Sequence, residues 1–202
     1  MKILVSTSMP ELIPDTEFDL DVPETRLDML KKLMDKSSAK KVGEFKGMSL
    51  YKTGDDQQSG YWFLINSAGD DLAYVCKFVT LGASSLHFKS KVVTQVAVWR
   101  NLDIYLTRKF PTYIFFNMLL PKYGVVMTDS QQTRAGRTFW QARIGDAIHK
   151  NLYVYTFDQN TRELQRLHNT DDLDNAAPYI WARDPKFRTR RVLISQTPLT
   201  LE

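Results

Sequence analysis

Between residues 45 and 99 the sequence repeats one pattern, in which a short apolar run rich in aromatic or β-branched residues is followed by a polar turn. The apolar runs span 45–51, 61–65, 72–79 and 91–99, and the intervening turns contain Gly54, Gly69 and Gly82. Runs of this length, bounded by Gly, Asp and Ser, are typical of β-strands joined as hairpins. The pattern therefore predicts four successive strands in an antiparallel meander.

After residue 100 the pattern changes to an alternation of helices and strands. The expected elements are a helix over 102–120, a strand over 124–127, a helix over 131–150, and strands over 152–157 and 190–195. Pro111 should kink or divide the first of these helices, because proline lacks an amide donor and clashes with the preceding turn. Residues 158–174 form a polar excursion in which we expect no regular element.

Hairpins followed by helix and strand alternation predict an α+β fold around one mixed sheet. We expect a central sheet of about six to seven strands flanked by helices, with two crossovers that should be right-handed. A chain of 202 residues, of which 43% are hydrophobic, is long enough for one ordinary core. The sequence therefore favours a single main domain.

The first thirty residues differ in charge from the rest of the chain. They hold two cations and seven anions, whereas the whole sequence has a formal net charge of +4. Residues 2–7 predict a short strand, and Pro10 and Pro14 among acids predict an arm without a helix up to residue 23. We therefore divide the chain into an acidic strand and arm over 1–23 and a single domain over 24–202. The arm is either a solvated leader or a segment that lies across a basic face of its own or a neighbouring subunit.

The first helix is expected directly after this arm. Apolar residues fall at helical spacing over 24–37, namely Leu27, Leu30, Leu33 and Met34. Pro23 suits the first turn, where its missing amide donor costs nothing. The apolar stripe of this helix must dock on another part of the fold.

Composition excludes several classes of protein and site. No apolar stretch approaches the length of a membrane span, and the apolar run at the N-terminus is too short for a signal peptide. Cys76 is the single cysteine, so we expect no internal disulfide, a buried inert thiol and a reducing cytoplasm. The three histidines lack ligand spacing, so we expect neither a metal site nor a Ser-His-Asp arrangement.

The order of elements resembles the GNAT acyltransferase fold, in which a long strand feeds a helix and then a second strand splayed from the first. The resemblance covers residues 43–196, and the segment over 125–140, VVMTDSQQTRAGRTFW, also resembles small phage proteins described as GNAT-like. It implies transfer of an acyl group from a thioester donor, such as acyl-coenzyme A, to an amine acceptor. Val96 and Val98 would then hold the acyl chain at the splay between the two strands.

Members of that family hold the coenzyme A diphosphate with backbone amides that follow the long strand. Their run is Gln or Arg, two residues, Gly, one residue, then Gly or Ala, and the corresponding run here is RNLDIY over 100–105. Arg100 matches, but Asp103 places a carboxylate against the diphosphate, and Tyr105 places a ring where the backbone must approach closely. The resemblance therefore implies a degenerate coenzyme A loop that binds ordinary acetyl-coenzyme A weakly or not at all.

Polar residues near the second splayed strand are candidates for chemistry. Asp129 comes at the end of that strand, where open sheets bind ligands, and it is either a general base or a cap of the next helix. Gln131 and Gln132 follow in the first helical turn and are candidate substrate ligands. Tyr155 shares a strand face with Tyr153. It is either a buried tyrosine with a satisfied hydroxyl, like Tyr153, or the acid that reprotonates a departing thiolate, a role that the resemblance implies.

Two basic segments are candidates for binding anions. Arg134 and Arg137 lie one turn apart on the expected helix over 131–150 and either hold a phosphate or carboxylate, such as a phosphate of the donor, or form a solvated cationic face. A later stretch interleaves cations with aromatic residues, namely Trp181, Arg183, Lys186, Phe187, Arg188, Arg190 and Arg191. That stretch either tracks a nucleic-acid backbone or is a charged edge strand.

Two functions follow from these observations. The first is an acyltransferase that uses an acyl donor at Val96, Val98 and Arg100. The second is a non-catalytic protein on a degenerate GNAT scaffold, which recognises a host protein or nucleic acid through a basic face. The departures at Asp103 and Tyr105 favour the second.

Overall fold

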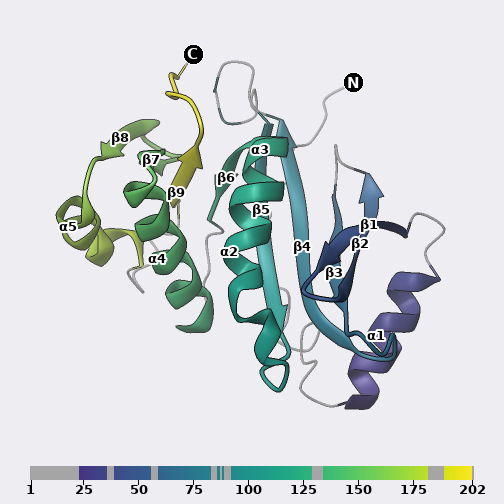
Figure 1. Ribbon diagram of the computed structural model, residues 1–202. Helices are drawn as coiled ribbons and strands as arrows, with labels where there is room; N and C mark the ends of the chain where they lie inside the picture. The colour runs from purple at the N-terminus through teal and green to yellow at the C-terminus, as the bar shows by residue number, and fades with distance from the viewer. Residues whose placement is uncertain are drawn as a thin grey trace, which may run out of the picture.

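The computed structural model describes residues 23–35, 39–55, 59–82, 86, 88, 92–128, 134–181 and 189–201. The expected strand over 2–7 and the acidic arm up to residue 22 lie outside this part of the chain. The described residues form an α+β fold on one sheet of nine strands, in the order β1-β2-β3-β4-β5-β6-β9-β7-β8 (Figure 1). None of the helices in these ranges is long and apolar enough to span a membrane.

The helices and strands have the following bounds. The strands are β1 (Lys40–Phe45), β2 (Met48–Asp55), β3 (Ser59–Ile65), β4 (Leu72–Gly82), β5 (Val92–Arg100), β6 (Gly124–Met127), β7 (Tyr153–Asp158), β8 (Glu163–Leu167) and β9 (Arg190–Ser195). The α-helices are α1 (Pro23–Met34), α2 (Phe110–Ile114), α3 (Leu120–Tyr123), α4 (Arg134–His149) and α5 (Thr170–Ile180). The expectation of about six to seven strands is therefore wrong, because the sheet contains nine.

One of the extra strands comes from a tight turn inside the first apolar run. Lys46 and Gly47 both adopt positive φ angles, 50° and 78°, which turns the chain sharply between β1 and β2. The expected single strand over 45–51 is therefore the end of one strand and the beginning of the next. The meander of β2, β3, β4 and β5 is antiparallel throughout, which confirms the hairpin prediction.

The other extra strand, β8, lies within the polar excursion over 158–174, and helix α5 begins inside it and continues to Ile180. The amide of Asp172 donates to Asn169 Oδ1 at 2.9 Å, and the amide of His168 donates to Asp172 Oδ2 at 2.7 Å. These reciprocal bonds satisfy amides at the start of α5 that have no partner within the helix. The expectation that 158–174 lacks a regular element is therefore wrong.

Strands β5 and β6 are adjacent and parallel, as predicted from the connection between them. Val92–Gln95 pair with Gly124–Met127. The connection is divided, with a 3-10 helix over Tyr105–Lys109, helix α2, a π-helical turn over Phe115–Leu119, and helix α3. Pro111 lies in the first turn of α2, where it divides the expected helix instead of kinking its middle.

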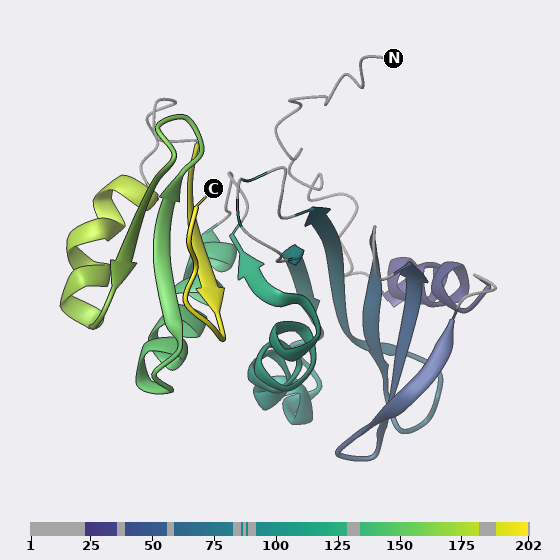
Figure 2. The same cartoon turned by 90° about the horizontal axis from the view of Figure 1, so that it is seen from above.

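Helices and loops cover both faces of the sheet. Helix α1 lies on one face of the sheet and α2, α3 and α4 on the other (Figures 1 and 2). Alternate residues of β3 point to opposite faces, so Trp62 and Leu64 belong to the cluster on the α2 side, while Phe63 and Ile65 cluster with residues of α1. A third cluster lies on the α1 face of β6, β7 and β9, where Leu86, Phe88 and Leu199 cover it. The main core therefore lies between the sheet and helices α2 to α5.

Helix α1 docks with a narrower face than the sequence predicts. Its first residue is Pro23, and Leu30 and Leu33 are buried. Leu27 and Met34, however, are each 41% exposed, so the apolar stripe is only partly used. Arg26 also anchors the helix, since its Nε lies 3.2 Å from Asp71 Oδ1.

Helix α4 contains a glycine that the structure does not require. A Cβ added at Gly145 would meet no atom within 4 Å, and its φ angle is not positive. We expect Gly145→Ala to raise the free energy of unfolding by about 0.5–1 kcal/mol, because alanine loses less conformational entropy in a helix interior. Urea denaturation checks this, and a loss of stability would contradict it.

Candidate functional site

The predicted donor-binding residues of β5 lie on one face of the sheet. Pairing of β5 with β6 ends at Gln95 and Met127, while β5 continues to Arg100. Alternation along β5 places Val96, Val98 and Arg100 on the face that helices α2 to α5 cover. Val96 is 5% exposed within the main core, and Val98 is half-buried against that core. The structure therefore brings these three residues together, but packs the two valines into the core.

Tyr74 lies beside these residues and was not predicted from the sequence. It pairs with Arg100 in the β4–β5 register, and its hydroxyl is buried without a hydrogen-bond partner in the described part of the chain. Burial raises the pKa of the Tyr74 hydroxyl well above its usual range, although the guanidinium groups of Arg143 and Arg100 oppose the shift. Tyr74 is therefore a neutral donor at physiological pH.

The loop after β5 bonds to itself and to the start of β4. Asn101 is 3% exposed, its amide donates to the carbonyl of Ala73 at 3.1 Å, and its Nδ2 donates to Asp71 Oδ2 at 3.3 Å. Its Oδ1 accepts from the amide of Asp103 at 3.0 Å. The amide of Thr107 donates to the carbonyl of Ile104 at 3.1 Å. The amides of Asn101 and Asp103, which belong to the segment expected to hold a diphosphate, are thus already bonded within the chain.

The outer side of this loop is apolar and exposed. Leu102 is 77% exposed, Tyr105 is 72% exposed and Leu106 is 44% exposed. The guanidinium carbon of Arg108 lies 5.4 Å from the centre of the Tyr105 ring. We call Leu102, Tyr105, Leu106 and Arg108 the β5-loop surface.

Tyr155 lies on the opposite face of the sheet from Val96. It is 6% exposed in the cluster around Leu86 and Leu199, and its hydroxyl accepts a hydrogen bond from the amide of Leu199 at 3.1 Å. Tyr153 packs against the same cluster, which confirms that the two tyrosines share a face. The structure therefore does not bring Tyr155 together with the predicted donor residues.

Most of the predicted residues near α4 lie outside the described part of the chain. This holds for Asp129, Gln131 and Gln132, and for the side chain of Arg134. Arg137 is described and exposed, with its guanidinium carbon 5.3 Å from the centre of the Trp181 ring. Arg137 therefore contacts an aromatic side chain of the fold itself.

The later basic stretch is only partly described, because Arg183, Lys186, Phe187 and Arg188 lie outside the described ranges. Arg190 Nε lies 3.2 Å from Asp158 Oδ2, and Arg191 is 4% exposed, with Nη1 donating to the carbonyl of Arg190 at 2.9 Å. Trp181 packs against the main core. The described cations of this stretch are thus engaged in the fold, which disfavours an open basic face built on them.

Two further expectations concern the thiol of Cys76 and the binding of a metal ion. Cys76 is fully buried in β4, and burial raises the pKa of its thiol, as expected of an inert cysteine. No group of three or more His, Cys, Asp or Glu side chains is placed to hold a metal ion within the described ranges.

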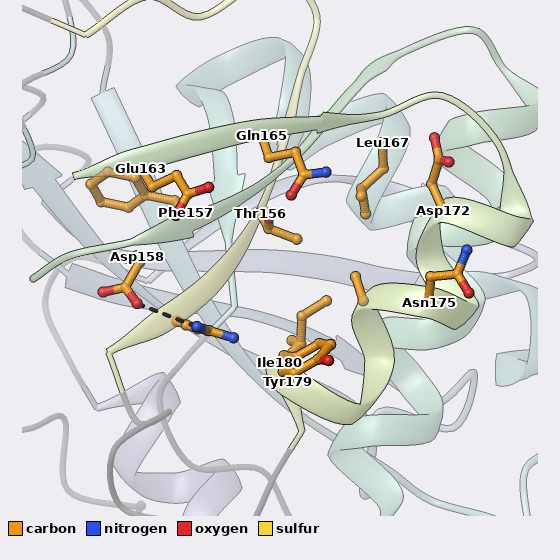
Figure 3. A pocket seen from close by; sticks show the side chains of 12 residues that line it. Thr156, Phe157, Asp158, Glu163, Gln165, Leu167, Asp172, Asn175, Tyr179 and Ile180 are labelled. Atoms are coloured by element: carbon orange, nitrogen blue, oxygen red, sulfur yellow. Dashed lines mark hydrogen bonds and ion pairs between the residues drawn. The ribbon is translucent and has the colours of Figure 1, made fainter. Parts of the chain in front are cut away.

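A cavity of about 350 Å³ lies between α5 and strands β7, β8 and β9 (Figure 3). Its lining includes the carboxylates of Asp158, Glu163 and Asp172 and the guanidinium of Arg190. A volume of this size falls within the range of small-molecule sites. Sequence reasoning missed the cavity because two of the elements that form it, β8 and α5, were not predicted.

Asp158 and Arg190 form a closed pair in this cavity. Asp158 Oδ1 accepts from the Thr189 hydroxyl at 3.0 Å and from the amide of Asn160 at 2.9 Å, besides the contact of Oδ2 with Arg190. Burial raises the pKa of the Asp158 carboxyl, but these bonds outweigh burial and lower it overall.

No known family model and no curated protein matches this chain.

Proposed function

We propose that this chain is a non-catalytic binding protein on a GNAT-like scaffold, which contacts a partner protein through the β5-loop surface. The observation that carries the proposal is the bonding of the loop after β5. Within the run over 100–105, the amide of Asn101 already donates to the Ala73 carbonyl and the amide of Asp103 to Asn101 Oδ1, so a diphosphate would have to displace bonds within the chain. The carboxylate of Asp103 would also repel it.

The composition of the β5-loop surface fits a protein partner. Tyrosine and arginine are enriched among the residues that contribute most to protein–protein affinity, and Leu102 and Leu106 add exposed apolar area. Arg108, which lies over the Tyr105 ring, and Lys109, the next residue, are both exposed, so the partner should present acidic groups around an apolar patch. Such a patch on the surface of a protein commonly marks an interaction site.

The scaffold part of the proposal rests on topology. A meander of strands ends in β5, which feeds a helical connection into the parallel strand β6, and β6 feeds α4 into β7. β9 then enters the sheet between β6 and β7. This succession supports the resemblance to the GNAT fold.

The first test is a calorimetric titration with acetyl-coenzyme A. We expect no binding, or a dissociation constant weaker than about 1 mM, because the loop amides are occupied and Asp103 is anionic. A dissociation constant in the low micromolar range would contradict the proposal. If weak binding is seen, the double variant Asp103→Gly/Tyr105→Gly should strengthen it, provided that the loop after β5 is where acetyl-coenzyme A binds.

The second test concerns the partner. Tagged wild-type protein and the variant Leu102→Asp/Tyr105→Asp are used to purify proteins from a lysate of the host cells. Val42→Asp serves as the matched control, because Val42 is 43% exposed on β1 and lies outside the β5-loop surface. A partner retained by wild type and by the control but lost by the double variant supports the proposal. Identical recovery by all three proteins contradicts it.

Acyl transfer is the second candidate, and one observation favours it. The buried Tyr74 hydroxyl lies in register with Arg100 on the face that carries Val96 and Val98, so a neutral proton donor stands beside the predicted acyl site. If acyl-coenzyme A is consumed in the presence of amines, Tyr74→Phe should lower kcat while leaving the melting temperature nearly unchanged. Equal activity of Tyr74→Phe would remove Tyr74 from that mechanism.

A further inference from the structure

Asp71, directly before β4, holds two other parts of the chain together. Its Oδ1 lies 3.2 Å from Nε of Arg26 in α1, and its Oδ2 accepts a hydrogen bond from Asn101 Nδ2 at 3.3 Å. The side chain of Arg26 is 12% exposed and that of Asp71 is 26% exposed, so water and salt screen this ion pair less than a pair on the open surface. One carboxylate therefore joins helix α1 to the loop after β5.

The backbone of Asp71 is held in place by the turn between β3 and β4. Asn66 Oδ1 accepts the Asp71 amide at 3.2 Å, and the Asn66 amide donates to the Asp71 carbonyl at 3.0 Å. Because the backbone is fixed, the freedom that remains to Asp71 is rotation of its carboxylate. The Leu72 amide donates to Oδ1 at 2.8 Å, but this bond alone lets Oδ2 turn away from Asn101. The contact of Arg26 with Oδ1 restrains that rotation.

The carboxamide of Asn101 carries this restraint into the loop after β5. Its Nδ2 donates to Asp71, and its Oδ1 accepts the amide of Asp103 at 3.0 Å, so the orientation of one end of the planar group fixes the other. The Thr107 hydroxyl donates to the carbonyl of Asn101 at 3.4 Å. Three of the four residues of the β5-loop surface lie in the chain between Asn101 and Thr107. Their placement therefore depends on how Asn101 is held.

We propose that Asp71 is a positioning residue that couples the docking of α1 to the conformation of the β5-loop surface. Arg26 and Asn101 bind different oxygens of one carboxylate, so each contact orients the carboxylate for the other. Displacement of α1 then loosens the loop, and a partner that orders the loop strengthens the docking of α1, because coupling between two sites is reciprocal. The use of this coupling in partner binding rests on the proposed function, whereas the coupling itself does not.

Amide hydrogen exchange of the full chain, followed by NMR, tests the coupling without a partner. We expect Arg26→Met, which keeps an aliphatic side chain but removes the guanidinium, to accelerate exchange of the Asp103 amide by about threefold or more. Amides in the β2–β3 pairing should keep their wild-type rates, a pattern that a general loss of stability would not produce. Lys31→Met is the matched control, because Lys31 is an exposed cation of the same helix, 3.9 Å from Asp28. It removes the same charge and should leave exchange at Asp103 unchanged.

Asp71→Ala removes both contacts at once and should accelerate exchange at Asp103 at least as much. Adding Arg26→Met to Asp71→Ala should then have no further effect, since the guanidinium acts on the loop through Asp71. The proposal is overturned if Arg26→Met leaves the Asp103 amide at its wild-type rate or if Lys31→Met accelerates it equally. It is also overturned if Arg26→Met has the same effect with and without Asp71. Because these rates are measured without a partner, a lysate experiment that recovers none contradicts the proposed function alone.

Discussion

Substitution of Phe110 by alanine is expected to lower the free energy of unfolding by about 3–5 kcal/mol, a large part of the stability of an ordinary domain. Phe110 is fully buried at the first position of α2. Its ring centre lies 4.8 Å from that of Tyr74 on β4 and 5.0 Å from that of Phe45 on β1. Its removal therefore leaves a cavity where the β5–β6 connection meets the meander.

Urea denaturation of wild type and Phe110→Ala measures this loss. Leu106→Ala is the matched control, because Leu106 belongs to the same connection but is 44% exposed, so its change in stability should stay within about 0.5 kcal/mol. Phe110→Leu, which keeps most of the buried volume, should lie between the two. A loss below about 1 kcal/mol for Phe110→Ala would show that the site collapses around the smaller side chain.

Gly60→Ala is expected to cost about 3 kcal/mol, because the new methyl group has no space. Gly60 is buried in β3 and pairs directly with Gly54 of β2. A Cβ at Gly60 would overlap the Thr53 carbonyl oxygen and would lie 2.8 Å from Cζ of Phe78. Because one neighbour is backbone and the other is a fully buried ring, neither can move without disturbing the β2–β3 pairing.

The melting temperature of Gly60→Ala should accordingly fall well below that of wild type. Gly43→Ala is the control in the same sheet, since a Cβ at Gly43 meets no atom within 4 Å. That variant should melt close to wild type. If both alanine variants melt at the temperature of wild type, the close contact between β2 and β3 at Gly60 is wrong.

The parts of the fold that were predictable carry strong local signals. Apolar runs bounded by polar turns identified β3, β4 and β5. Asn151, just after α4, adopts a φ of 55°, a conformation that asparagine tolerates at helix ends, and its amide is bonded to the carbonyl of Ile148. Each of these features depends on residues that are close in sequence.

The features that were not predicted depend on weaker or distant signals. Strand β8 is mostly polar and stands last in the order of the described strands, and its sequence lacks the alternation of a half-buried strand. Asn169 and the acids that follow it were a usable signal for α5, but Pro178 inside that helix opposes it. The bonding of Asn101 to Asp71 joins residues 30 positions apart, and no local pattern encodes it.

The position of β9 determines the order in which the sheet can be completed. β9 lies between β6 and β7, and Leu193–Ser195 pair with both neighbours at once. Both neighbours are synthesised before it, so β6 and β7 each present an unpaired edge until β9 arrives, whereas the β1–β5 meander closes through local hairpins. Unpaired strand edges are templates for association with other chains. The β6–β7 gap is therefore a place where a nascent or partly unfolded chain is exposed to aggregation.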